Sequence, residues 1–203
     1  PKPRPSRKRV PVRNPRAFLR PLAVGAPTPS GDVPFRPSRL IHFFDPSNEK
    51  MAAKVPTIAG QVDIILGNLE DAVKTEKKEA ARQGLVDIAK ATDFGDTQLW
   101  TRVNSLDSPW VLDDLITLVT EIGDKLDVIM VPKVEGPQDI HYVDRILAQL
   151  EARAGLDRQI LVHAILETAE GVANVDPVVT AHDEISPWLN AFALAHSAHN
   201  VTL

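Results

Sequence analysis

The sequence predicts an α/β fold, a (β/α)8 barrel that is incomplete in this chain. Short apolar runs recur about every 30 residues with helix-like segments between them, the pattern of repeated βα units around a parallel sheet. An open doubly wound sheet is the competing arrangement, but no GxGxxG or P-loop sequence follows any of these runs. Polar residues at the ends of several different runs favour the barrel.

Composition limits the class of protein. The chain has 203 residues, of which 43% are hydrophobic, enough for one sizeable core. It contains no cysteine, which excludes a disulfide framework and thiol chemistry. No apolar run approaches the ~18 residues of a membrane span, so we expect no membrane partner.

The N-terminal segment differs from the rest of the chain. Residues 1–37 hold ten of the seventeen prolines, which disfavours a helix or an inner strand. Eight of the 23 Lys and Arg residues lie in the first 20 positions, but only Phe18 interleaves with them, so we expect no nucleic-acid partner. The expected domains are a basic, Pro-rich arm (1–37) and a partial barrel (38–203).

The first βα unit is predicted after this arm. Leu40–Phe44 is a short strand candidate, and residues 45–48 (Asp-Pro-Ser-Asn) form a turn that ends in a helix N-cap. Glu49–Ile58 is a short helix interrupted by Pro56. Val62–Leu69 follows as a buried strand.

Two carboxylates, Glu70 and Asp71, stand at the end of this second strand. Lys74–Lys90 is then an amphipathic helix. Its predicted apolar stripe consists of Ala80, Ala81, Leu85, Ile88 and Ala89.

Arg102 lies inside the third strand candidate, Leu99–Val103. A buried guanidinium is costly without a partner. A structural ion pair with Glu70 or Asp71 on the neighbouring strand therefore competes with a functional role.

A helix over Trp110–Ile122 and a strand over Leu126–Val131 make up the next unit. Lys133 follows that strand, either as an anion contact or as a solvated residue at the strand end. Pro137–Ala154 is a helix with proline in its first turn, where the missing N–H costs nothing.

The fifth strand candidate is Leu161–Leu166, and Glu167 stands at its carboxyl end, where α/β folds place their chemistry. Glu170–Thr180 is a weak helix, and Ala191–Ala195 is a possible sixth strand. His163 is expected to be an interior residue, because it lies inside the fifth strand candidate. No histidine spacing typical of a zinc site is present, so we expect no zinc.

Four motifs occur in this order: LEDAV followed by Lys78 and Arg82, WTRVNSLDSPW, DVIMVPKVEGPQDIHYVD and ILETAEG. Together they resemble the malyl-CoA lyase branch of the HpcH/HpaI aldolase and citrate lyase β-subunit superfamily. The segments RPLAVGAP and RLIHFF match the same branch.

The resemblance implies a (β/α)8 barrel that uses Mg²⁺, with Mn²⁺ as a possible replacement, and acts on CoA thioesters. The implied reaction cleaves or forms the C–C bond of malyl-CoA-type 3-hydroxyacyl-CoA, giving glyoxylate and acetyl-CoA, or propionyl-CoA from β-methylmalyl-CoA. It also implies a cytoplasmic homo-oligomer. Two alternatives stay open: a class II aldolase acting on free pyruvate, and an inactive barrel fragment or binding module.

The resemblance also assigns roles to residues. Glu167 matches the family's metal ligand, and Arg102 its active-site arginine, which binds substrate and stabilises negative charge. Glu70 and Asp71 match the family's acidic pair, which with Arg102 makes up the implied catalytic residues and orients Arg102 and metal-bound water. Phe43 matches an aromatic position near the CoA site, with Lys54 or Lys50 as a basic CoA contact.

One departure concerns a second metal ligand. The family carries an aspartate after its sixth strand, and the nearest alignment places Ala198 there. We therefore expect a chain that diverges after about residue 180 and holds about six of the eight βα units.

Overall fold

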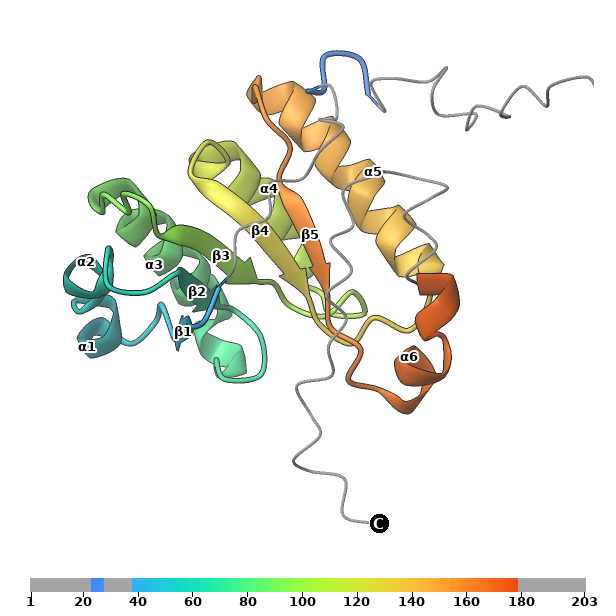
Figure 1. Ribbon diagram of the computed structural model, residues 1–203, viewed down its shortest axis with the longest axis horizontal. Helices are drawn as coiled ribbons and strands as arrows, with labels where there is room; N and C mark the ends of the chain where they lie inside the picture. The colour runs from blue at the N-terminus through green and yellow to red at the C-terminus, as the bar shows by residue number, and fades with distance from the viewer. Residues whose placement is uncertain (1–22, 28–37, 179–203) are drawn as a thin grey trace, which may run out of the picture.

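The computed structural model describes residues 23–27 and 38–178. Its centre is a five-stranded sheet (Figure 1). The strands are β1 (Ile41–Phe44), β2 (Ile64–Asn68), β3 (Gln98–Arg102), β4 (Leu126–Val131) and β5 (Leu161–Ala164).

The strand order is β1-β2-β3-β4-β5, and each strand pairs in parallel with the next. A doubly wound sheet would reverse its order at a switch point, whereas successive units of a barrel add strands on one side only. The described strands therefore form five consecutive strands of an incomplete barrel, and the predicted fold class is confirmed.

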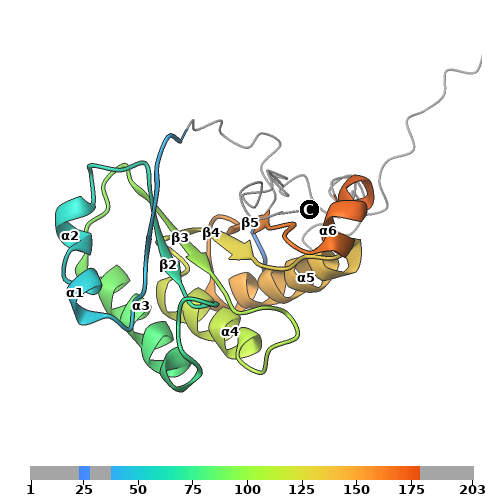
Figure 2. The ribbon, with the colours of Figure 1, turned by 90° about the horizontal axis from the view of Figure 1, so that it is seen from below.

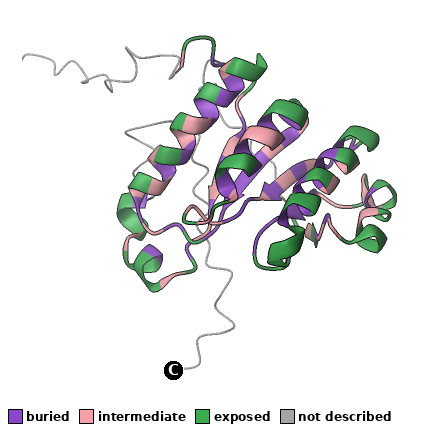
Figure 3. Cartoon of the chain, turned by 180° about the vertical axis from the view of Figure 1, so that it is seen from behind, coloured by how far each residue is buried: buried purple, intermediate pink, exposed green. Residues whose placement is uncertain are grey.

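Helices connect the strands and cover one face of the sheet, as Figure 2 shows for the three long ones. The helices are α1 (Glu49–Ala52), α2 (Val55–Ile58), α3 (Lys78–Ala91), α4 (Val111–Ile122), α5 (Pro137–Ala154) and α6 (Ala169–Ala173), with a 3-10 turn η2 (Thr75–Lys77) before α3. Each long helix is buried on the side that faces the sheet and exposed on the other (Figure 3). Among the described residues, no helix combines the length and apolarity needed to cross a bilayer.

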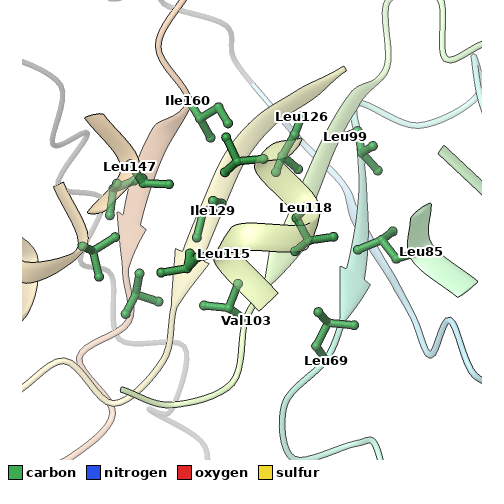
Figure 4. Packing of buried hydrophobic residues seen from close by; sticks show 14 of the residues in the cluster. Leu69, Leu85, Leu99, Val103, Leu115, Leu118, Leu126, Ile129, Leu147 and Ile160 are labelled. Carbon is green, nitrogen blue, oxygen red and sulfur yellow. The ribbon is translucent and has the colours of Figure 1, made fainter. Parts of the chain in front are cut away.

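The hydrophobic core lies between these helices and the sheet (Figure 4). Leu85 of α3 and Leu118 of α4 pack against strand residues such as Leu99 and Ile129, all at most 1% exposed. Side chains alternate along each strand, so the residues between these face the opposite, inner side of the sheet. On that side, the rings of Trp100 and His163 lie 5.5 Å apart.

Most predicted elements are present with shifted ends. The strand and helix predicted over Leu126–Val131 and Pro137–Ala154 have those bounds. The predicted helix Glu49–Ile58 is two separate helices, with Pro56 in the first turn of the second. Proline is tolerated in the first turn of a helix, but it cannot extend a preceding helix, because it lacks the N–H that would bond to the turn before it.

The apolar stripe predicted for the helix Lys74–Lys90, which is α3 in the structure, was wrong at one position. Ala80 is exposed, whereas the charged residues Lys78 and Arg82 are buried beside Ala81 and Leu85. Lys78 donates to the backbone carbonyls of Leu69 and Glu70 after β2, and Arg82 pairs with Asp114 of α4, so both charges are compensated. The strand predicted at Ala191–Ala195, Ala198 and most of the arm 1–37 lie outside the described residues.

Candidate active site

Four charged residues gather at the carboxyl end of the sheet. Glu70 follows β2, Arg102 ends β3, Lys133 follows β4 and Glu167 follows β5. Because parallel strands end at the same edge, residues as far apart in sequence as Glu70 and Glu167 are brought to one place.

Arg102 is held by two partners from β2 and the loop after it. Its Nε donates a hydrogen bond to Asn68 Oδ1 over 3.0 Å, and its Nη2 lies 3.3 Å from Glu70 Oε2. The side chains of Arg102 and Glu70 are 18% and 4% exposed. The ion pair that competed with a functional role is therefore present, and it orients the guanidinium at the mouth of the sheet.

Glu70 uses its two carboxylate oxygens differently. Oε1 accepts a 2.6 Å hydrogen bond from Lys133 Nζ, whereas Oε2 has no aligned hydrogen-bond donor among the described residues despite the nearby Arg102. A buried carboxylate oxygen normally accepts such bonds, so Oε2 keeps unused acceptor capacity at the site.

Lys133 connects both sides of the cluster. Its Nζ also lies 3.2 Å from each carboxylate oxygen of Asp71, and its backbone N–H donates to Glu167 Oε1 over 3.2 Å. The hydrogen bond to Glu70 is the main cause that raises the pKa of Lys133. Burial opposes the charged form of Asp71, but its contacts with Glu70 and Lys133 outweigh this and lower its pKa. The ammonium thus stays charged between two carboxylates.

A second buried cation supports the loop that carries the acidic pair. Lys78 Nζ donates to the carbonyl oxygens of Leu69 (2.7 Å) and Glu70 (2.9 Å) and lies 5.6 Å from the ring centroid of Trp110. Burial lowers the pKa of Lys78, and the charge of Glu70 opposes that shift. Lys78 therefore fixes the backbone from which Glu70 and Asp71 project.

The loop after β3 is fixed in a similar way. Asp114, fully buried on α4, accepts hydrogen bonds from Arg82 Nε (2.8 Å) and from the backbone N (3.0 Å) and Nδ2 (2.7 Å) of Asn104. These charge-assisted bonds join α3, α4 and the backbone two residues after Arg102.

The two predicted CoA contacts come from β1 and from the junction of α1 and α2. Phe43 belongs to β1, pairs with Leu66 and is 44% exposed. Lys54 is exposed between α1 and α2. Among the described residues, the ion pairs of Glu70 and Asp71 are with Arg102 and Lys133 and not with Lys54.

Glu167 has the chemistry of a ligand for a hard cation. Glu167 is exposed and offers carboxylate oxygen, the donor that Mg²⁺ and Mn²⁺ prefer. Among the described residues, no three His, Cys, Asp or Glu side chains group together as a metal site. Glu167 therefore stays a candidate metal ligand predicted from the family resemblance.

Sequence reasoning missed two participants, Asn68 and Asn104, whose only signal was their position at strand ends. It left open whether Lys133 contacts an anion or is solvated, and in the structure its ammonium contacts the carboxylates of Glu70 and Asp71. His163 lies on the inner side of the sheet but is partly exposed, so its prediction as an interior residue holds only in part; burial lowers its pKa to about 4.

Comparison with known proteins adds a family to this geometry. The profile of the HpcH/HpaI aldolase/citrate lyase family matches residues 39–190. A malyl-CoA/β-methylmalyl-CoA/citramalyl-CoA lyase of Chloroflexus aurantiacus is 55% identical over 87% of this chain and 50% of its own length. An L-malyl-CoA/β-methylmalyl-CoA lyase of Cereibacter sphaeroides is 33% identical over 79% of this chain and 49% of its own. The chain thus spans about half the length of these curated relatives.

Solved structures share the fold. A citrate lyase from Burkholderia xenovorans superposes with a TM-score of 0.58 at 16% identity, over 75% of this chain and 53% of that one. The CitE protein of Mycobacterium tuberculosis, in complex with magnesium and acetate, gives 0.52 at 22% identity, over 70% and 49%. At such identities the likeness concerns the fold, and it agrees with the parallel sheet described above.

Proposed function

The chain belongs to the HpcH/HpaI aldolase/citrate lyase family, and from this membership we propose that it carries the active-site face of a Mg²⁺-dependent CoA-thioester lyase. The proposed reaction is the retro-Claisen cleavage of malyl-CoA-type 3-hydroxyacyl-CoA to glyoxylate and acetyl-CoA, or its reverse. The observation that carries the proposal is Arg102, held by Asn68 and Glu70 at the carboxyl end of the sheet, the same end at which Glu167 follows β5.

Arg102 supplies the positive charge that this reaction needs. Cleavage moves the electrons of the C–C bond onto the thioester, so negative charge develops on its oxygen. A guanidinium that is already oriented stabilises such charge without reorganising, and its planar fork also fits a carboxylate. Arg102 uses Nε on Asn68 and turns Nη2 toward Glu70, so its orientation is set before substrate binds.

Glu167 would hold the divalent cation through its carboxylate. When bound, the cation supplies Lewis acidity and a template for the hydroxyl and carboxylate oxygens that become glyoxylate. Glu70 and Asp71 orient the cations of the site, Arg102 and Lys133, through the contacts described above.

Phe43 and Lys54 are proposed to contact the CoA part of the substrate. A half-exposed ring offers an apolar surface, and an exposed ammonium suits a phosphate. We further propose that residues 1–37 form an arm on a catalytic domain of residues 38–203, and that the protein works as a cytoplasmic homo-oligomer.

The test is glyoxylate release from malyl-CoA by the purified 203-residue chain. We expect release with Mg²⁺ or Mn²⁺ and none after EDTA. Free malate and 4-hydroxy-2-oxo acids serve as matched substrates, because an aldolase acting on free pyruvate would cleave the latter and ignore the thioester. Cleavage that persists in EDTA, or that needs no thioester, would contradict the proposal.

A further inference from the structure

Lys133 has an unusual backbone conformation. Its φ of 53° lies in the left-handed region, and the other positive φ values in the described part of the chain belong to glycines. Side chains other than glycine enter this region at a cost, and residues held there cluster at functional sites. Glycine would adopt this conformation without strain, so the conformation itself does not explain a lysine here.

The surrounding loops impose that conformation. Val134 N–H donates to the Ile165 carbonyl (3.1 Å), Ile165 N–H donates to the Val131 carbonyl (2.9 Å), and Asn174 Nδ2 donates to the Glu135 carbonyl (2.9 Å). A Cβ on Gly171 would lie 2.2 Å from the Val134 oxygen, so α6 approaches this loop as closely as a glycine permits. The segment after β4 is therefore fixed against the segment that carries Glu167.

From this fixed backbone the Lys133 side chain reaches past β3. Its Nζ meets Glu70 Oε1 at 2.6 Å and Asp71 at 3.2 Å, on the loop after β2. Its own N–H meets Glu167 Oε1 on the other side. One residue thus joins the acidic pair to the candidate metal ligand.

The ammonium has a specific effect on Arg102. Glu70 has two oxygens, and Lys133 fixes Oε1 while Oε2 faces Arg102 without an aligned hydrogen bond. Since the Glu70 side chain is 4% exposed, water is a poor substitute for the lost ammonium. Without Lys133 the carboxylate would rotate about its free torsions, and Arg102 would lose its alignment.

We propose that Lys133 is a positioning residue of the active site. Its ammonium fixes the orientation of Arg102 through Glu70, and its backbone N–H fixes the orientation of Glu167. The left-handed backbone lets this one residue make both contacts. The inference deepens the proposed lyase function and rests on it for the chemistry, but the positioning itself can be measured without turnover.

Three substitutions separate the ammonium from the backbone. Lys133→Met removes the charge and keeps the strained conformation, Lys133→Gly removes the charge and relieves the strain, and Lys133→Arg keeps a cation. Lys125→Met is the matched control, because Lys125 precedes β4 at the opposite end and bonds to the Ala89 carbonyl at 2.7 Å.

The first readout is hydrogen exchange of the Arg102 Nε–H, observed by NMR on the arginine-labelled 203-residue chain. We expect exchange to become at least tenfold faster in Lys133→Met and Lys133→Gly, and to stay within about twofold of wild type in Lys133→Arg and Lys125→Met. Unchanged exchange in Lys133→Met would overturn the proposal. So would wild-type exchange in Lys133→Gly beside fast exchange in Lys133→Met, because the backbone strain would then be the cause. If Lys133→Met fails to fold, Lys133→Gly still tests the loss of the ammonium, because it has no backbone strain.

The second readout is steady-state cleavage of malyl-CoA. We expect kcat to fall about 10- to 100-fold in both charge-removing variants with KM changed little, and Lys133→Arg to recover part of the loss. If Arg102 Nε–H exchange is fast in both charge-removing variants but the wild type does not cleave malyl-CoA, the positioning role is supported and the lyase function is refuted. An active wild type with unchanged kcat in Lys133→Met refutes the positioning role alone.

Discussion

Glu167 is an exposed carboxylate of the cluster, and its Oε1 accepts a hydrogen bond from the backbone N–H of Lys133. Glu167→Gln keeps an acceptor for that N–H and removes the negative charge that a hard cation needs. We expect Mg²⁺-dependent glyoxylate release to fall at least about 100-fold while the unfolding midpoint stays the same. Full activity in Glu167→Gln would exclude Glu167 as the metal ligand.

Arg102 permits a sharper substitution than alanine. Arg102→Lys keeps the charge, but an ammonium lacks the fork that serves Asn68 and Glu70 together. We expect kcat to fall about 100-fold, similar to the loss of one oriented donor to developing negative charge. The measurement is kcat and KM for malyl-CoA; a rise in KM with unchanged kcat would assign Arg102 to binding only.

At the scale of the element, Glu151 ties α5 to β5. It is 2% exposed near the end of α5, and its Oε1 accepts the Ile160 N–H at 2.7 Å. Burial is the main cause that raises its pKa to about 7; the Ile160 bond and Arg158 act against this, and Asp144 adds to it. The folded state therefore binds a proton that the unfolded state has already released between about pH 4.5 and 7, and stability falls as pH rises through that range.

Glu151→Gln should remove this pH dependence. The amide keeps an oxygen for Ile160 and carries no charge to desolvate. We expect the variant to be more stable than wild type at pH 8, by at most about 3 kcal/mol, and to match it at pH 4. Urea unfolding at the two pH values measures this, and an equal difference at both would show that the charge of Glu151 is not the cause.

The elements themselves were largely predictable because their signals are local. A continuous apolar run such as residues 126–131 carries its strand signal within the run, and Pro137 marks the start of α5. The burial of Lys78 and Arg82 was not predictable from the helical period, because the period assumes that charged residues face water. Their partners, the carbonyls after β2 and Asp114, come from other elements.

At the scale of the whole molecule, the site was predictable only in part. A parallel sheet places all its carboxyl ends together, so Glu70, Arg102 and Glu167 could be assigned to one edge from the strand pattern. The reach of Lys133 past β3 depends on its φ of 53° and on the loop against α6, neither of which has a sequence signal. Roles for Phe43 and Lys54 remain predictions of the family resemblance.

Metal binding at the mouth should also stabilise the whole fold. A ligand that binds only the folded state adds RT ln(1 + [L]/Kd), which is about 1.4 kcal/mol at ten times Kd. For a domain of this size that corresponds to a rise of about 3–5 °C in the unfolding midpoint. We expect saturating Mg²⁺ to give such a rise in wild type and none in Glu167→Gln, with NaCl of equal ionic strength as the control for charge screening. An equal rise in both proteins would mean that the cation binds elsewhere on the acidic surface, and that Glu167 does not organise a metal site.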